Sequence, residues 1–190
     1  MRFEHVLVVG AGQMGGGIAQ VVAAHHPDRV VSLTLIATSA AGDRAADTPL
    51  PSMDPTLAGG PPEPDWSDPE AVATYLVEQQ RPYAGTLGFD EAAARRTARL
   101  VVQRSHDVAA AGNHWQLAGD SDPFPMSAIR VPTLVMHGTA DPLFPFPHGE
   151  ALAAEIASAR LVPLPGMGHE HPPPALWDVV VPALLAHTGT

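Results

Sequence analysis

The apolar positions of this chain form short continuous runs separated by stretches of helical spacing. Four runs have strand length and many branched side chains: residues 6–9, 30–36, 133–136 and 160–164. Such runs are typical of strands buried on both faces of a parallel sheet. Helical spacing follows three of them, at residues 14–26, around 151–156 and at 175–186. This alternation predicts an α/β fold with an open parallel sheet.

The stretch between the second and third runs has a different character. Seven prolines and the pair Gly59-Gly60 fall between about residues 40 and 69, which predicts loop or linker. Three helical segments are expected next, starting near residues 67–69, 90–91 and 107. We therefore expect a core made of residues 1–40 and 128–190, and a Pro-rich linker with a helical cap at 41–127.

Composition narrows the classes of partner. The formal net charge is −10, all ten basic residues are arginines, and there is no cysteine. Disulfides, thiolate metal sites and a cysteine nucleophile are thereby excluded, and an acidic surface makes nucleic acid an unsuitable partner. No apolar run approaches the ~20 residues that span a bilayer, and Met1–His5 leads into a run too short for a signal peptide. We expect a soluble, cytoplasmic protein with no membrane partner.

Two polar residues follow strands at the carboxyl edge of the expected sheet. Asp141 lies a few residues after the run 133–136, and His169 a few residues after 160–164. Because the carboxyl ends of parallel strands lie at one rim, the two side chains are expected within hydrogen-bonding reach. A carboxylate that orients an imidazole is the supporting half of a nucleophile–base–acid triad.

Longer segments carry a family resemblance: His25–Val30, Ser32–Leu35, Val131–Pro142, Gly166–His169 and Ala175–Trp177. They resemble the α/β-hydrolase superfamily, in the esterase branch that includes anthracycline methylesterases. The similarity runs from about His5 to His187, with residues 40–125 matching only as a variable lid. It implies an α/β-hydrolase-like sheet that lacks the N-terminal strands, and an ester hydrolase acting on a small apolar ester. Asp141 would be the triad acid and His169 the general base.

The glycine-rich turn after the first strand departs from this family's pattern. The family has G-x-S-x-G, in which the serine is the nucleophile. Aligning Met14-Gly15-Gly16 puts Gln13 at the serine position, whereas aligning Val9-Gly10 puts Gly12 there. We take Gln13 as the nucleophile position, and the resemblance then implies that the Met14 backbone N–H serves an oxyanion hole. Neither an amide nor a glycine can attack an acyl carbon.

Two other functions compete with ester hydrolysis. One is a non-catalytic relative or fragment that binds a hydrophobic ligand or a partner. In the family several strands precede the glycine-rich turn, so the resemblance implies an uncovered sheet edge that self-association or an upstream partner segment would cover. The other is an NAD-dependent oxidoreductase, because Gly10, Gly12 and Gly15 spell G-x-G-x-x-G. The second strand ends at Ile36–Ser39 without the acid that binds a ribose, so we expect no cofactor.

The remaining histidines and aromatic residues are expected to have structural roles and no role in catalysis or metal binding, with His171 as the exception. Five histidines are expected on the surface or in the lid, and none of them at a metal site: His25, His26, His106, His114 and His148. His171 is a weaker rival to His169 as the base. Tyr75, Phe89 and Trp115 are expected in the core of the lid, and Phe144 and Phe146 at the mouth of a pocket.

Overall fold

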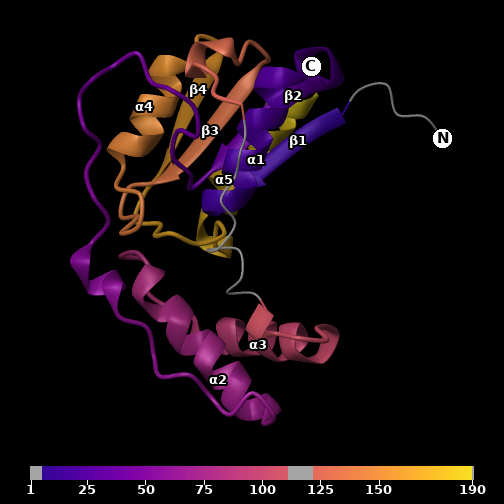
Figure 1. Cartoon of the computed structure of the whole chain (residues 1–190), viewed down its shortest axis with the longest axis vertical. Helices are drawn as coiled ribbons and strands as arrows, with labels where there is room; N and C mark the ends of the chain where they lie inside the picture. Colours follow the sequence, from indigo (N-terminus) through magenta and orange to yellow (C-terminus); the bar gives the residue numbers. More distant parts are fainter. Residues whose placement is uncertain (1–5, 111–121, 190) are drawn as a thin grey trace, which may run out of the picture.

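A four-stranded parallel sheet forms the centre of the protein. The computed structural model describes residues 6–110 and 122–189, and orders the strands β1-β2-β3-β4 (Figure 1). The strands are β1 (Val6–Ala11), β2 (Val30–Ile36), β3 (Thr133–Gly138) and β4 (Ala159–Leu164). The expected α/β class with a parallel sheet is confirmed.

Helices cover both faces of this sheet (Figure 1). On one face α1 (Gly12–His25) and α4 (Pro147–Glu155) share a core with inward-facing residues of β2 and β3, including Leu33 and Leu35. On the other face α5 (Trp177–Thr188) packs on Leu134 and Met136. Each fully buried aliphatic side chain contributes roughly 1.5–3 kcal/mol relative to exposure, so these two clusters hold the strand ends in place.

The sheet is less well covered at β1. Among the described strands β1 pairs only with β2, so it forms one edge of the sheet. Leu7 and Val9 are 49% and 54% exposed there, and Ile18 of α1 is 58% exposed. In the described part of the chain no helix is long and apolar enough to cross a membrane.

The segment between β2 and β3 folds as an extended linker and a helix pair. A short 3-10 turn at Pro55–Ala58 precedes α2 (Pro69–Gln80) and α3 (Glu91–Arg104), whose apolar faces pack together. Asp68 caps α2 by accepting hydrogen bonds from two backbone N–H groups of its first turn, which satisfies donors that have no partner within the helix. The third expected helix, starting near residue 107, falls mostly on 111–121, outside the described residues.

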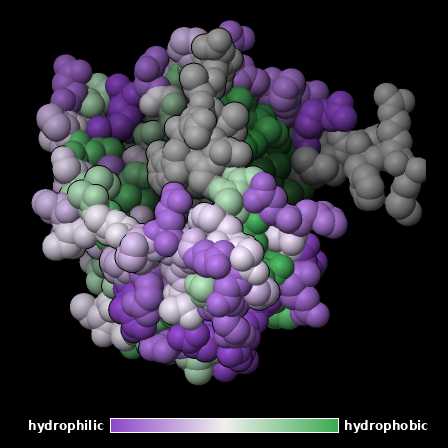
Figure 2. Space-filling view, turned by 60° about the horizontal axis from the view of Figure 1, so that its bottom comes forward, coloured by the Kyte–Doolittle hydropathy of each residue, from purple (hydrophilic) through white to green (hydrophobic). Residues whose placement is uncertain are grey.

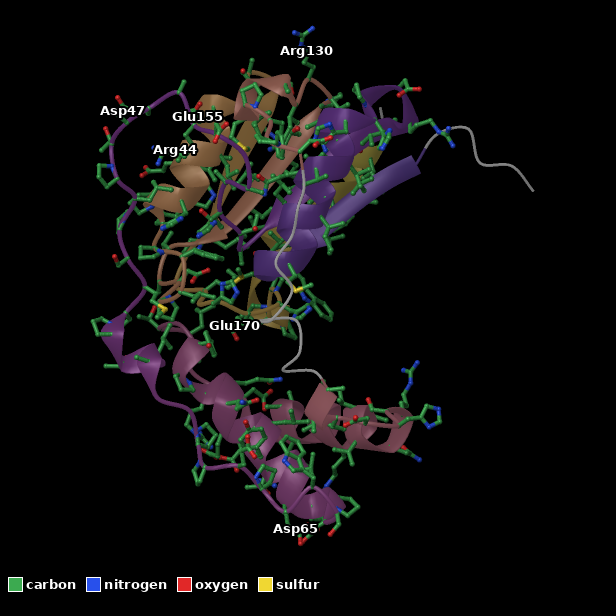
Figure 3. The ribbon with its side chains drawn as sticks, viewed as in Figure 1. Arg44, Asp47, Asp65, Arg130, Glu155 and Glu170 are labelled. Atoms are coloured by element: carbon green, nitrogen blue, oxygen red, sulfur yellow. The ribbon has the colours of Figure 1, made fainter. Side chains whose placement is uncertain are left out.

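The helix pair lies beyond the carboxyl ends of the strands (Figure 1). Its surface is mostly hydrophilic when it is turned toward the viewer (Figure 2). The linker is fastened to α4, because Glu155 accepts hydrogen bonds from Ala45 N and Ala46 N at 2.9 and 3.0 Å. Arg44 lies next to the same carboxylate (Figure 3). These contacts fix the first part of the linker against α4, on its path from the sheet to the helix pair.

Candidate active site

Asp141 is held rigidly in the loop that follows β3. Its side chain is buried, and Oδ1 accepts hydrogen bonds from Leu143 N at 2.9 Å and Phe144 N at 2.8 Å. Asp-Pro sequences favour such local turns, in which the side chain bonds to backbone two or three residues on. Oδ2 remains for His169, whose Nδ1 lies 2.9 Å away. The structure therefore brings the two sequence-selected residues together.

The loop that carries His169 is clamped by the segment after α2. His169 N donates a hydrogen bond to Tyr83 O at 2.8 Å, and the two rings are 6.0 Å apart. The backbone of Gly168 packs against Tyr83 and Gly85 so closely that a Cβ would clash. Glu170 lies in the space between the sheet and α2 (Figure 3). Its carboxylate accepts hydrogen bonds from Gly85 N, in the segment after α2, and from Gly168 N, in the loop that carries His169. Residues far apart in sequence thus fix the direction of the imidazole.

The pairing with Asp141 determines what His169 can do. A carboxylate accepts only, so Nδ1 of His169 carries the proton in this hydrogen bond and Nε2 keeps its lone pair. When Nε2 takes up a proton, the buried charge of Asp141 stabilises the resulting imidazolium. The arrangement is that of a general base with its orienting acid.

Nε2 of His169 faces Gly12, the residue at the turn from β1 to α1. Gly12 has φ +66°, in the left-handed region that favours glycine, and a Cβ built on it would lie 3.8 Å from Nε2. A hydroxyl one bond beyond such a Cβ would come within hydrogen-bonding distance of Nε2. The turn itself is tight, because the α-carbon of Gly10 packs against Gly15 and Gly16.

This geometry favours the alternative alignment of the turn. The sequence interpretation put Gln13 at the nucleophile position, but β1 remains paired with β2 up to Ala11, and the chain turns at Gly12. Gln13 follows in the first turn of α1, as does Met14, whose side chain is 40% exposed. A Cβ added to Gly12 at this turn would thus point to His169.

His137, which the sequence did not single out, lies beneath the Asp141 loop. It is fully buried, with Nε2 2.7 Å from Phe144 O and 3.7 Å from Asp141 Oδ2. Burial lowers its pKa from the usual 6.5, against the weaker opposing effects of the Phe144 hydrogen bond and the Asp141 charge. The neutral imidazole therefore donates Nε2–H to the Phe144 carbonyl. Its position within a continuous apolar strand was the available signal that it is buried.

The expectation that His148 lies on the surface or in the lid is wrong. His148 is only 8% exposed and lies in the first turn of α4, where its two ring nitrogens contact Ser39 and Pro51. His25, His26, His106 and His171 are exposed. His114 and Trp115 lie outside the described residues.

Aromatic side chains pack against His169, His148 and His137. The ring of Phe144 is 5.5 Å from that of His169 and 5.2 Å from that of His148. Phe146 contacts His137 at 6.2 Å. In the helix pair, Tyr75 packs on Trp66, and Phe89 joins the contact between α2 and α3. Phe144 therefore contacts both His169 and His148.

Neither of two hollows found elsewhere on the protein includes the Asp141–His169 pair. A groove of about 530 Å³ runs between α5 and β4, and a pocket of about 170 Å³ lies at α2 and α3. Within residues 6–110 and 122–189, no three His, Asp or Glu side chains are grouped so that they could hold a metal ion.

Comparison with known proteins extends the architectural result. The profile of the alpha/beta hydrolase fold family matches residues 3–171. Rhodomycin D methylesterase DnrP of Streptomyces peucetius is 28% identical over 207 residues, which cover 99% of this chain and 67% of that protein.

Solved structures of other hydrolases share the fold of this chain. The enol-lactonase from Burkholderia xenovorans LB400 superposes with a TM-score of 0.67 at 22% identity, over 99% of this chain and 67% of the other. The 2-hydroxy-6-oxo-6-phenylhexa-2,4-dienoate hydrolase from Rhodococcus sp. strain RHA1 gives a TM-score of 0.65 at 21% identity, over 99% and 65%. The chain spans about two thirds of the length of these relatives. It belongs to the alpha/beta hydrolase fold family.

Proposed function

We propose that this chain hydrolyses a small apolar ester by general-base activation of a water molecule held over Gly12. The proposal rests on the way three residues follow one another. Asp141 Oδ2 lies 2.9 Å from His169 Nδ1, and a Cβ added to Gly12 would lie 3.8 Å from His169 Nε2. A side-chain nucleophile would occupy that space in a serine hydrolase. Here a glycine leaves it open to water.

The chemistry needs only groups that this chain supplies. His169 Nε2 takes a proton from water as the water oxygen attacks the ester carbonyl. The same proton then goes to the departing alkoxide, which leaves as the alcohol, while Asp141 stabilises the transient imidazolium. No covalent intermediate forms, so the rate enhancement comes from positioning, from the base and from stabilisation of the oxyanion.

The start of α1 is the proposed source of that oxyanion stabilisation. The first N–H groups of a helix have no partner within the helix, and they lie at its positive end. In hydrolases of this fold the residue after the nucleophile provides one donor. With Gly12 at the turn that donor is the backbone N–H of Gln13, whereas the sequence interpretation, with Gln13 at the turn, implied Met14.

Residues 41–127 are proposed to act as the linker and cap of a core formed by 1–40 and 128–190. Support comes from the clamp between the segment after α2 and the His169 loop, through Tyr83 O and His169 N at 2.8 Å. The loop around Gly85 also packs on Gly166 and Gly168. A cap attached at this point would exclude bulk water from the base and limit the size of the ester.

The test is hydrolysis of p-nitrophenyl acetate by the purified chain. His169→Ala should lower turnover by about 10²- to 10⁴-fold, the usual contribution of a general base. His171→Ala is the matched control, since it removes an exposed imidazole two residues away, and its turnover should equal that of the unmodified protein. Equal turnover in the His169→Ala variant would contradict the proposal.

A binding role without catalysis is the second candidate, favoured by the half-exposed Leu7 and Val9 on edge strand β1. It predicts a defined oligomer or complex by analytical ultracentrifugation, with no His169-dependent turnover. The NAD-dependent oxidoreductase stays a prediction from Gly10, Gly12 and Gly15, and it requires saturable NAD binding in a calorimeter.

A further inference from the structure

A second serine–histidine pair lies outside the Asp141–His169 site. Ser39 Oγ is 2.7 Å from His148 Nδ1, and His148 Nε2 is 2.9 Å from Pro51 O. Ser39 follows β2, Pro51 belongs to the linker, and His148 lies in the first turn of α4. Three segments more than ten residues apart in sequence thus converge on one imidazole.

The partners of His148 fix its tautomer. The Pro51 carbonyl can only accept, so Nε2 carries the proton and Nδ1 keeps its lone pair. The Ser39 hydroxyl therefore donates its hydrogen to Nδ1. An activated nucleophile has this arrangement: its hydroxyl is hydrogen-bonded to the unprotonated nitrogen of a histidine, and a third group orients that histidine.

The loop that holds Ser39 is pre-formed. Buried Gln20 accepts a hydrogen bond from Ala41 N at 2.9 Å and donates one to Ser39 O at 2.9 Å, so it fixes the backbone that directly follows the Ser39 side chain. Ala37 has φ +47°, an unfavourable value for a residue with a Cβ, and it turns the chain at the end of β2. The surrounding contacts therefore hold Ser39 in one place.

The pair lies near the proposed hydrolytic site but uses none of its residues. Phe144 packs against both His148 and His169, with ring centroids 5.2 and 5.5 Å away. Ser39 is itself half-buried, whereas His148 is buried. Ser39 is therefore the more exposed member of its pair, and Phe144 is the side chain that the two sites share as a neighbour.

We propose that Ser39 is a nucleophile for acyl transfer, with His148 as its general base and small activated esters as its substrates. Ser39 Oγ bonds to the carbonyl carbon while its proton passes to His148 Nδ1. The ester C–O bond then breaks, and the alkoxide takes that proton and departs as the alcohol. The acyl group then remains on Ser39 as an ester, so this step produces an adduct and adds no steady-state ester turnover.

This inference goes beyond the proposed function, because it assigns a covalent step to residues that the water mechanism does not use. The two can be separated by their readouts. Removing His169 should abolish steady-state ester turnover and leave the covalent adduct on Ser39 intact. Removing Ser39 should abolish that adduct and leave the ester turnover intact.

The test is labelling with a small alkyl fluorophosphonate, in which a serine oxygen displaces fluoride at phosphorus, followed by peptide mapping. The unmodified protein should carry the adduct on Ser39, and Ser39→Ala should carry none. His148→Gln should slow labelling about 100-fold or more, the size expected for loss of a general base. His169→Ala should label at the unmodified rate. Ser67 serves as an internal control, because its hydroxyl is bonded to Asp65 and not to a histidine.

Three results would overturn the proposal. They are absence of an adduct on Ser39 in the natively folded protein, an unchanged labelling rate in His148→Gln, and equal labelling of Ser67. Circular dichroism establishes the fold of each variant. The unmodified protein and His169→Ala both keep the Ser39 contacts, so they decide the outcome even if Ser39→Ala does not fold.

Discussion

The two histidines that contact Phe144 each have one of the two partners that a catalytic histidine has in a triad. His169 has a carboxylate partner, with Nδ1 2.9 Å from Asp141 Oδ2, but the residue facing its Nε2 is a glycine. His148 has a hydroxyl partner, with Nδ1 2.7 Å from Ser39 Oγ, but its other nitrogen meets only the Pro51 carbonyl.

The difference lies in what each orienting group does for the charged imidazole. A carboxylate fixes the tautomer and also stabilises a positive ring, and charge-assisted hydrogen bonds are about twice as strong as neutral ones. A carbonyl also fixes the tautomer, but it stabilises a positively charged ring only through its dipole and not through a full negative charge. The His169 site therefore offers a carboxylate beside the ring that would take a proton from water, and the His148 site offers a hydroxyl that is already in place.

The largest expected effect separates the two sites through Asp141→Asn. The amide keeps an oxygen for Leu143 N and Phe144 N but removes the charge next to His169, and the ring then favours the tautomer with its proton on Nε2. Ester turnover should fall about 10³- to 10⁴-fold, as for loss of a triad acid by this substitution. The rate of adduct formation at Ser39, followed by mass spectrometry, should stay unchanged. A parallel fall of both rates in a natively folded variant would mean that the sites are not independent.

A smaller effect should appear in the pH dependence of stability, through His137 beneath the Asp141 loop. Burial lowers the pKa of His137 below 6.5 in the folded protein, so the unfolded chain takes up this proton first as the pH falls. Its stabilising effect is complete above pH 6.5 and is lost progressively below it, by up to about 1.4 kcal/mol per pH unit, until the folded pKa is passed.

The measurement is urea unfolding between pH 7.5 and about 5 for the unmodified protein and His137→Gln, which keeps a donor for Phe144 O. The variant should show a shallower loss of unfolding free energy toward low pH. Identical slopes would contradict the assignment of this loss to His137, because the other titrating groups are common to both proteins.

The regular architecture was predictable because local patterns determine it. Continuous apolar runs identified β2 and the buried part of β3, and the rule that active groups follow the carboxyl ends of parallel strands selected Asp141 and His169. The start of α2 followed from Asp68 and Pro69, since a capping side chain and a proline in the first turn act within a few residues.

The remaining features depend on register or on distant contacts. Whether Gly12 or Gln13 faces His169 depends on how far β1 stays paired, and a single residue changes the answer. The burial of His148 results from partners 109 and 97 residues away in sequence, Ser39 and Pro51. No periodicity around His148 carries that information, and Ser39 alone is an ordinary loop serine.

The central claim is that Gly12 occupies the position from which a nucleophile would meet His169. The most direct test is fluorophosphonate labelling of Gly12→Ser and Gln13→Ser, each in a Ser39→Ala background and mapped by mass spectrometry. A side chain at φ +66° costs about 1–2 kcal/mol, which circular dichroism can show to be tolerated. We predict an adduct at position 12 that disappears when His169→Ala is added, and none at position 13. An adduct at position 13 and none at position 12 would contradict the account.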